Sequence, residues 1–239
     1  MKRVLLAAAL LCAILAAAPA SADVIYDNGA PDGNDALLST VAAGAPVFAL
    51  DDFTLAEGSE TITDVHWWGA YYDSEYDPTA EDQAFGVLIV PDDGGLPDLS
   101  GLDFFAIPVV IPTVSATGNT VAAVSVPGDF SDGPRDVYEY SAFLDTPITL
   151  TPGVTYWLSI IDLSAIYSGR DPLADPTFAW STSAVQGGNT QYSFGGFVAT
   201  EDEMAFQLTN DGVVPEPASI LLMGFGLAGV AWRTRKKRS

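Results

Sequence analysis

A two-residue alternation of apolar and polar side chains dominates this chain from Asp23 to Thr209 and constrains its fold more than any other feature. This pattern is typical of β-strands with one buried face, and no helical pattern of ordinary length interrupts it. Turn-forming residues separate the alternating segments. The main turn clusters are Pro31–Gly33, Pro91–Gly95, Pro127–Gly128, Asp132–Pro134, Thr151–Gly153 and Gly187–Asn189.

Many short strands punctuated by Gly and Pro predict an all-β fold, a jelly-roll-like β-sandwich of about ten strands over residues 23–212. The clearest predicted strands are Val47–Leu55, Ile62–Tyr72, Ala84–Val90, Phe104–Ile111, Val121–Val126, Val137–Phe143, Thr155–Asp162, Thr177–Thr182, Gln191–Ala199 and Met204–Thr209.

The alternation also predicts which strand faces are buried. In Thr155–Asp162, Trp157 and Ile161 point one way and Leu158 and Ile160 the other, so both faces are apolar and the strand should be central. In the last strand, inward-facing residues should alternate with exposed ones. The inward set is Met204, Phe206 and Leu208, and the outward set is Ala205, Gln207 and Thr209.

The first 22 residues have the composition of a secretory signal peptide, with cleavage expected after Ala22. Lys2 and Arg3 precede an apolar run, and Ala20-Ser-Ala22 forms the small-residue cleavage site. A first transmembrane helix is the alternative, but the run is short and no stop-transfer pattern follows it. Acylation of Cys12 is a second alternative, but Leu11 stands where lipoprotein signals have a small residue. Cys12 is the only cysteine, so the exported protein should lack disulfides.

The body between the two ends is strongly acidic. Residues 23–217 carry all 31 acidic side chains and only two basic ones, Arg135 and Arg170, for a formal charge of −29. This charge excludes nucleic-acid binding and attracts divalent cations. Colloidal stability outside the cell is the alternative explanation of the acidity.

The C-terminal segment 213–239 has the order of a membrane anchor. Pro215, Glu216 and Pro217 end the sandwich, and the uncharged stretch 218–232 predicts a single transmembrane helix. Its 15 residues span about 22 Å, short of the roughly 30 Å hydrocarbon core. A basic stop-transfer tail follows and should remain cytoplasmic. Its residues are Arg233, Arg235, Lys236, Lys237 and Arg238.

The Val-Pro-Glu-Pro segment, the short glycine-containing apolar helix and the basic terminus together resemble the PEP-CTERM sorting signal of Gram-negative bacteria, with Pro215, Glu216 and Pro217 matching its tripeptide. The resemblance implies recognition and cleavage by exosortase. It also implies a precursor anchored in the inner membrane by the helix, and later transfer to the cell surface or an exopolysaccharide matrix.

The body is similar to the β-sandwich modules of PEP-CTERM proteins, including the choice-of-anchor type. The similarity rests on Tyr26–Gly29, Asp51–Leu55, Ile62–Gly69, Phe85–Ile89, Asp93–Pro97 and Leu150–Trp157. It implies no known activity and assigns no catalytic residue.

Catalytic chemistry has little support in the sequence, and no catalytic residue is predicted. His66 is the only histidine, and we interpret it as a strand residue at the rim of the sandwich. The competing hypothesis is a secreted glycan hydrolase that uses two carboxylates. Its candidate pairs are Asp51–Asp52, Glu81–Asp82, Asp92–Asp93 and Glu201–Glu203, which mostly adjoin turns, where solvated acids are expected.

Two ligand-binding hypotheses remain. The segment from Asp27 to Asp35 predicts a glycine-containing calcium loop, although an Asx-turn loop with solvated acids would look the same. Its oxygen ligands would be Asp27, Asn28, Asp32, Asn34 and Asp35. An aromatic group predicts carbohydrate stacking, although core packing of most of its rings is the alternative. These rings are Trp67, Trp68, Tyr71 and Tyr72.

These features predict a non-enzymatic, exported surface or matrix protein that uses its sandwich to bind exopolysaccharide or calcium, the only cofactor the sequence suggests.

Overall fold

The computed structural model describes residues 23–42, 45–73, 75–80, 83–103, 106–126, 129–167, 177–187, 190–193 and 196–210. The predicted signal peptide with Cys12, the sorting signal with its helix and basic tail, and the Glu81–Asp82 pair lie outside these residues. The chain divides into two compact units, and the unit Val24–Asn210 holds the strands described below.

The described residues form an eight-stranded and a seven-stranded β-sheet, so the all-β sandwich is confirmed with more strands than the ten or so predicted. In spatial order the first sheet contains β1 (Asp23–Asp27), β15 (Phe206–Asn210), β5 (Thr61–Tyr71), β9 (Asp129–Thr149), β8 (Thr113–Val126), β2 (Pro31–Leu38), β11 (Phe178–Gln186) and β14 (Asp202–Met204). The second contains β13 (Gly196–Ala199), β12 (Thr190–Ser193), β4 (Ala45–Thr54), β3 (Thr40–Ala42), β10 (Thr155–Asp162), β6 (Phe85–Pro91) and β7 (Val109–Val110).

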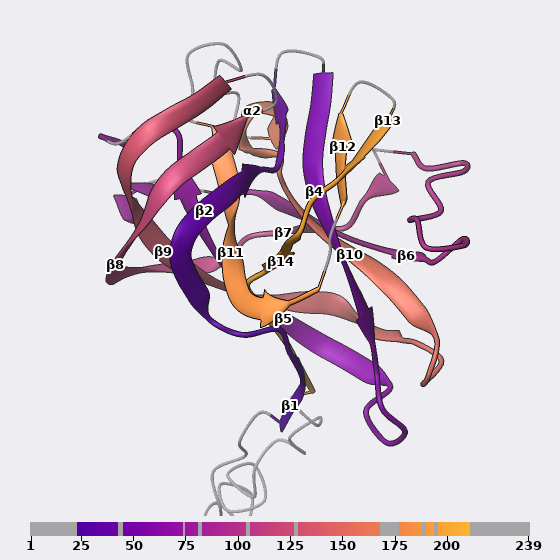
Figure 1. Cartoon of the computed structure of the whole chain (residues 1–239). Coiled ribbons are helices and arrows are strands. Elements are labelled where there is room, and N and C mark those ends of the chain that lie inside the picture. Colours follow the sequence, from indigo (N-terminus) through magenta and orange to yellow (C-terminus); the bar gives the residue numbers. More distant parts are fainter. Residues whose placement is uncertain are drawn as a thin grey trace, which may run out of the picture. The chain divides into compact units, whose positions relative to one another are not determined.

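Helical structure in this part of the chain is short and includes the turn of α2 (Ser164–Tyr167) and the 3₁₀ helix η1 (Pro78–Ala80). Within the described residues, no helix has the length and apolar character that a membrane span requires. In Figure 1 the ribbons of β8, β9, β2 and β11 lie on one side of the body, and those of β4, β12, β10 and β6 on the other.

A main core fills the space between the sheets and is rich in aromatic rings. Trp67 of β5 stacks on Tyr140 of β9, with ring centroids 5.4 Å apart and an interplanar angle of 5°. Phe85 of β6 packs edge-on against Trp67 and against Phe178 of β11. These rings come from both sheets, so they join the two layers through buried aromatic area.

β10 confirms the prediction of a central strand with two apolar faces. It pairs with β4 on one side and β6 on the other. Leu158 and Ile160 enter the main core, whereas Trp157 and Ile161 pack on the opposite face of the sheet in an outer cluster with Leu88.

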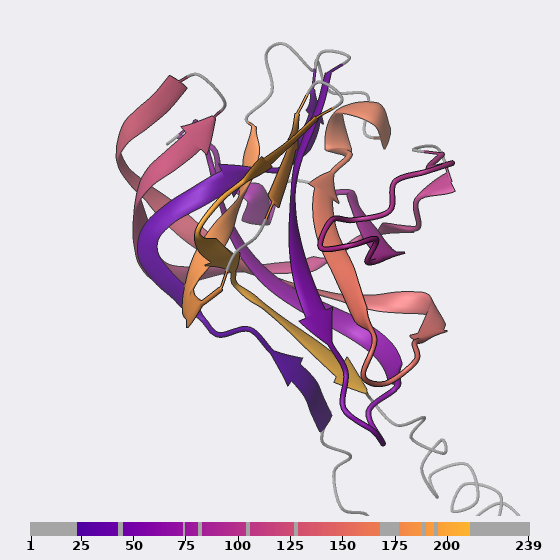
Figure 2. The ribbon, with the colours of Figure 1, turned by 45° about the vertical axis from the view of Figure 1, so that its right-hand side comes forward.

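Five strands of the eight-stranded sheet close into a ring, because β11 pairs with β5 as well as with β2. The order around the ring is β5, β9, β8, β2, β11 and back to β5. Figures 1 and 2 show the strongly bent β2 beside the long hairpin of β8 and β9. A cluster of small apolar side chains, the ring cluster, draws on all five strands. It consists of Ala36, Ala70, Val121, Val124, Val137 and Ala179.

The prediction of a loop over Asp27–Asp35 is wrong, because Pro31–Leu38 is strand β2. The chain turns at Gly29, whose φ of 85° suits glycine. Leu37 and Leu38 are buried and pair with β11, and this burial outweighs the turn-forming composition of Pro31–Gly33.

Two other predicted strands differ from the structure. Of Phe104–Ile111, only Val109–Val110 is a strand among the described residues, and Pro108 and Pro112 flank it. Gln191–Ala199 is not one strand, because β12 pairs antiparallel with β13 from Thr190↔Ala199 to Ser193↔Gly196.

The last predicted strand, Met204–Thr209, is interrupted at Ala205, between β14 and β15. Its inward residues Met204, Phe206 and Leu208 are buried as predicted, but Ala205 and Thr209 are buried too. The Ala205 amide donates to Ser181 O, and its carbonyl accepts from Trp180 Nε1. The outward face is therefore partly covered by neighbouring strands.

Candidate metal centre

Asp51 occupies a core position of β4. It lies on the same strand face as Ala49 and Phe53 of the main core, whereas Phe48 and Leu50 on the other face belong to the outer cluster. β12 pairs with β4 only as far as Leu50, so the edge of β4 is free of β12 from Asp51 onward. The Asp51 side chain is fully buried, and Asp52 beside it is half-buried.

Glu203 reaches the same position from β14 of the other sheet. β14 pairs with β11, with Glu203 opposite Ser183, and Glu203 is only 6% exposed. Its carboxylate lies against Gly187, where an added Cβ would overlap Oε1. Glycine at this position therefore leaves room for the acid.

Asn28, between β1 and β2, links the two acids. Its Nδ2 lies 2.8 Å from Asp51 Oδ2, 3.1 Å from Glu203 Oε2 and 2.9 Å from Met204 O. The Met204 amide donates to Asp51 Oδ2 at 2.6 Å, and Tyr26 OH donates to Asn28 Oδ1 at 3.2 Å. Asp51 Oδ2 thus has two donors, whereas the buried Oδ1 has no hydrogen-bond partner among the described residues.

Carboxylate oxygens of Asp51, Asp52 and Glu203 all lie within 4.8 Å of one another. We call these three residues the carboxylate cluster. Burial and the neighbouring Glu203 carboxylate raise the pKa of Asp51 well above its ordinary value, against the opposing effect of the Met204 amide. Burial, Glu203 and Asp92 likewise raise the pKa of Asp52. Both shifts report negative charge held close together and away from water.

The calcium residues predicted from the sequence do not converge. Only Asn28 reaches the carboxylate cluster. Asp27 accepts from the Gly29 amide, an Asx turn of the kind the alternative reading expected. Asp32 and Asp35 lie on β2, where Asp32 accepts from Thr182 and Asp35 from Ser125. The backbone amide and the side-chain Nδ2 of Asn34 both donate hydrogen bonds to Asp32.

From the sequence, the three members of the carboxylate cluster are predicted to be mostly solvated acids beside turns. For Asp51 and Glu203 this is wrong, since both are buried. One signal was present: Asp51 stands on the same alternating face as Ala49 and Phe53, so an acid occupies an expected core position. Nothing in the sequence indicated that Glu203 would face it.

The predicted sugar-stacking group is mostly core. Trp67 and Tyr71 are buried in the main core and cannot stack on a ligand. Trp68 is half-buried against the ring cluster, and Tyr72 is 38% exposed. His66 lies on β5 as predicted, with Nε2 2.8 Å from Asp64 Oδ2.

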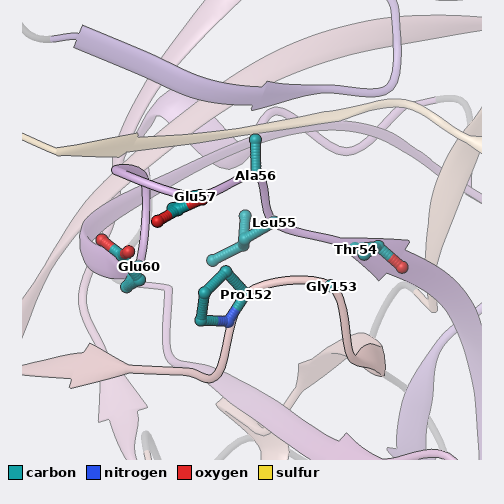
Figure 3. Close-up of a pocket in the computed structure, with 7 residues that line it drawn as sticks. All are labelled: Thr54, Leu55, Ala56, Glu57, Glu60, Pro152 and Gly153. Carbon is teal, nitrogen blue, oxygen red and sulfur yellow. The ribbon is translucent and has the colours of Figure 1, made fainter.

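A shallow depression of about 590 Å³ lies where the β4–β5 loop meets the turn between β9 and β10. Figure 3 shows Leu55 and Pro152 toward its middle, with Glu57 and Glu60 together at one side. Glu60 accepts from the Gly58 amide at 2.9 Å, and this hydrogen bond lowers the pKa of Glu60.

An acidic two-sheet sandwich followed by a Pro-Glu-Pro segment defines a class of protein, the exported domain with a C-terminal sorting motif. Residues 213–236 match the PEP-CTERM protein-sorting motif, so the resemblance at Pro215–Pro217 is confirmed. The chain belongs to the family described as a domain of unknown function (DUF7901), which matches residues 26–193. No curated protein and no solved structure matches the chain. The motif implies an exported protein that is anchored in the membrane before exosortase processes it.

Proposed function

We propose that this protein is a non-enzymatic component of the cell surface or extracellular matrix of a Gram-negative bacterium, released by exosortase from an inner-membrane precursor. The observation that carries the proposal is the position of the sorting motif. The last strand, β15, ends at Asn210, and the motif match begins at residue 213. Cleavage at the motif would therefore release every described strand in one piece.

Mass spectrometry of the native exported protein tests this processing. We expect a mature form that starts at Asp23 and lacks the segment after Pro217, recovered from the surface or matrix fraction. A variant with Pro215, Glu216 and Pro217 replaced by alanine should lose its signal peptide but keep its C-terminal segment. It should therefore remain in the inner membrane. Recovery of Trp232 and the basic tail in the wild-type surface form would contradict the proposal.

The proposed role of the sandwich is to hold matrix material, either exopolysaccharide or calcium. The charge of −29 over residues 23–217 disfavours direct contact with an anionic polymer and favours neutral glycans or cations. Tyr72 is the exposed ring of the aromatic group. A polysaccharide pull-down with the exported protein, with and without calcium, should retain it. Tyr72→Ala would weaken a stacking contact, and failure of the wild type to bind any glycan would leave calcium and a structural role.

A carboxylate-based glycan hydrolase is the second candidate, because the depression holds Glu57 and Glu60 together. The lowered pKa of Glu60 suits an ionised base or nucleophile, not the general acid that glycosidases also need. We expect no release of reducing ends from the matrix polysaccharide. Release that is lost in both Glu57→Gln and Glu60→Gln would establish the enzyme instead.

A further inference from the structure

We propose that Asp51, Asp52 and Glu203 form a calcium site that joins the two sheets of the sandwich. This inference specifies the calcium-binding part of the proposed function and rests on it. It is independent of sorting and of polysaccharide binding.

The carboxylate cluster holds negative charge that no basic side chain among the described residues neutralises. Three carboxylates lie within 4.8 Å of one another, two of them buried. In the described part of the chain the basic side chains are Arg135 and His66. Arg135 donates to the carbonyls of Tyr72, Gly133 and Pro134, and His66 pairs with Asp64. The cluster's recorded donors are neutral, the Asn28 amide and the Met204 backbone N–H.

One carboxylate oxygen of Asp51 is buried without a hydrogen-bond partner among the described residues. Asp51 is fully buried, yet its Oδ1 accepts no hydrogen bond within the described residues, while Oδ2 accepts two. A buried polar atom without a partner is costly and rare in native proteins. Because Asp51 and Glu203 are close and both are acceptors when ionised, a cation satisfies Oδ1 where another carboxylate cannot.

Neighbouring residues hold the Glu203 carboxylate in place. Glu203 Oε2 is fixed by Asn28 Nδ2, and its carboxylate fills the space that Gly187 leaves without a side chain. Asn28 is itself oriented by Tyr26 OH. These contacts orient the ligand side chains from outside the cluster, as hydrogen-bond partners of metal ligands commonly do.

The ligand chemistry points to calcium. All three donors are carboxylate oxygens, without the nitrogen or sulfur that zinc favours. Calcium binds oxygen at about 2.3–2.6 Å, so two oxygens on opposite sides of the ion lie about 5 Å apart, whereas magnesium requires about 4.2 Å. The cluster's carboxylate oxygens lie within 4.8 Å of one another, close enough for all three side chains to bind one calcium ion.

A calcium ion here would tie β4 of one sheet to β14 of the other at the point where β12 leaves the edge of β4. The site would therefore stabilise the folded protein wherever calcium is available, as any ligand that binds only the native state does.

Calorimetry and thermal melting of the full chain in detergent, with calcium chloride or magnesium chloride at constant ionic strength, test the proposal. We expect calcium to raise Tm by about 5 °C or more at a hundredfold excess over Kd, and magnesium to raise it less. Terbium luminescence, sensitised by Tyr26, should report the same site and should be lost when calcium displaces the probe.

The isosteric variants Asp51→Asn and Glu203→Gln should weaken calcium binding at least about tenfold and abolish the Tm shift. Neither should unfold the protein, since each removes a repulsive charge while keeping the side-chain volume. Gly187→Ala should also weaken binding, because it displaces Glu203 without changing charge. The matched control is Asp93→Asn, an exposed loop acid, which should bind like the wild type.

The outcomes separate the two proposals. No calcium binding by the wild type would overturn calcium binding by the sandwich altogether. Binding that survives Asp51→Asn and Glu203→Gln but falls in Asp32→Asn or Asp35→Asn would keep calcium binding and overturn this site. An unchanged Tm in calcium, with greater stability of the wild type at acid pH, would indicate a proton shared by Asp51 and Glu203 instead of a metal.

Discussion

Asp64 and His66 pair on the face of β5 opposite the main core, and they form an ion pair when His66 is protonated. Burial alone would raise the pKa of Asp64, but hydrogen bonds from His66 and Thr209 and the charge of His66 hold it below its ordinary value. A carboxylate with a lowered pKa stabilises the fold above its unfolded pKa. This stabilisation is lost as the pH falls through the folded pKa, below 3.8.

Replacing His66 by alanine should therefore reduce stability at neutral pH by about 1 kcal/mol or less, because the pair is partly exposed. It should also move acid unfolding to higher pH. Urea melts between pH 2.5 and 7 would measure both effects. Gln207→Ala, at the neighbouring position of β15, is the control and should leave the acid limb in place. Unchanged acid unfolding in His66→Ala would mean that His66 does not set the pKa of Asp64.

Gly69 is required by a close approach of two strands. An added Cβ would overlap the ring of Phe178 and lie 2.8 Å from Ala179 O. Gly69→Ala should lower the free energy of unfolding by about 3 kcal/mol, at the upper end of overpacking costs, because a backbone atom cannot give way. Gly94→Ala is the contrast, since nothing lies within 4 Å of its Cβ and only its positive φ is strained. It should cost about 1 kcal/mol. Equal urea midpoints for the two variants would contradict this.

At the scale of elements, the ring of β5, β9, β8, β2 and β11 depends on small side chains on its inner face. Ala36, Ala70 and Ala179 alternate along their strands with large residues of the main core, such as Leu37, Tyr71 and Phe178. The same strands therefore carry a large face toward the sandwich and a small face toward the ring. This asymmetry allows β11 to pair with both β2 and β5.

Ala179→Leu should consequently destabilise the protein by about 1–3 kcal/mol, because the ring has no space for the added methyl and methylene groups. Ala122→Leu is the matched control on β8, at an exposed position, and should change stability by less than about 0.5 kcal/mol. Chemical unfolding measures both. A tolerated leucine at position 179 would show that the ring is looser than its packing indicates.

At the scale of the whole molecule, the −29 charge of the exported body destabilises the folded state through repulsion between its acidic side chains. Raising sodium chloride from 10 to 500 mM shortens the Debye length from about 30 Å to about 4 Å. We expect Tm to rise over this range because repulsion between surface acids is screened. Sucrose at matched osmolality is the control for general solute effects, and a Tm that falls with salt would contradict the expectation.

Much of the fold was accessible from local pattern. β10 was predicted with its bounds, its central place and its two apolar faces, because strand alternation is a property of neighbouring residues. β2 was not, since Pro31–Gly33 reads as a turn until Leu37 and Leu38 find partners on β11. The candidate site could not be predicted either, because Asn28 and Met204, which donate hydrogen bonds to Asp51, come from opposite ends of the body.

The amino-acid sequence by itself determined the destination and the fold class. The Pro-Glu-Pro motif is contiguous, and the period-2 alternation repeats along the body, so both can be recognised from the sequence. Only the tertiary structure determined which acidic side chains are buried. Asp51 and Glu203 meet because the packing of the two sheets brings β14 against β4, and such a long-range contact is not encoded in any local period.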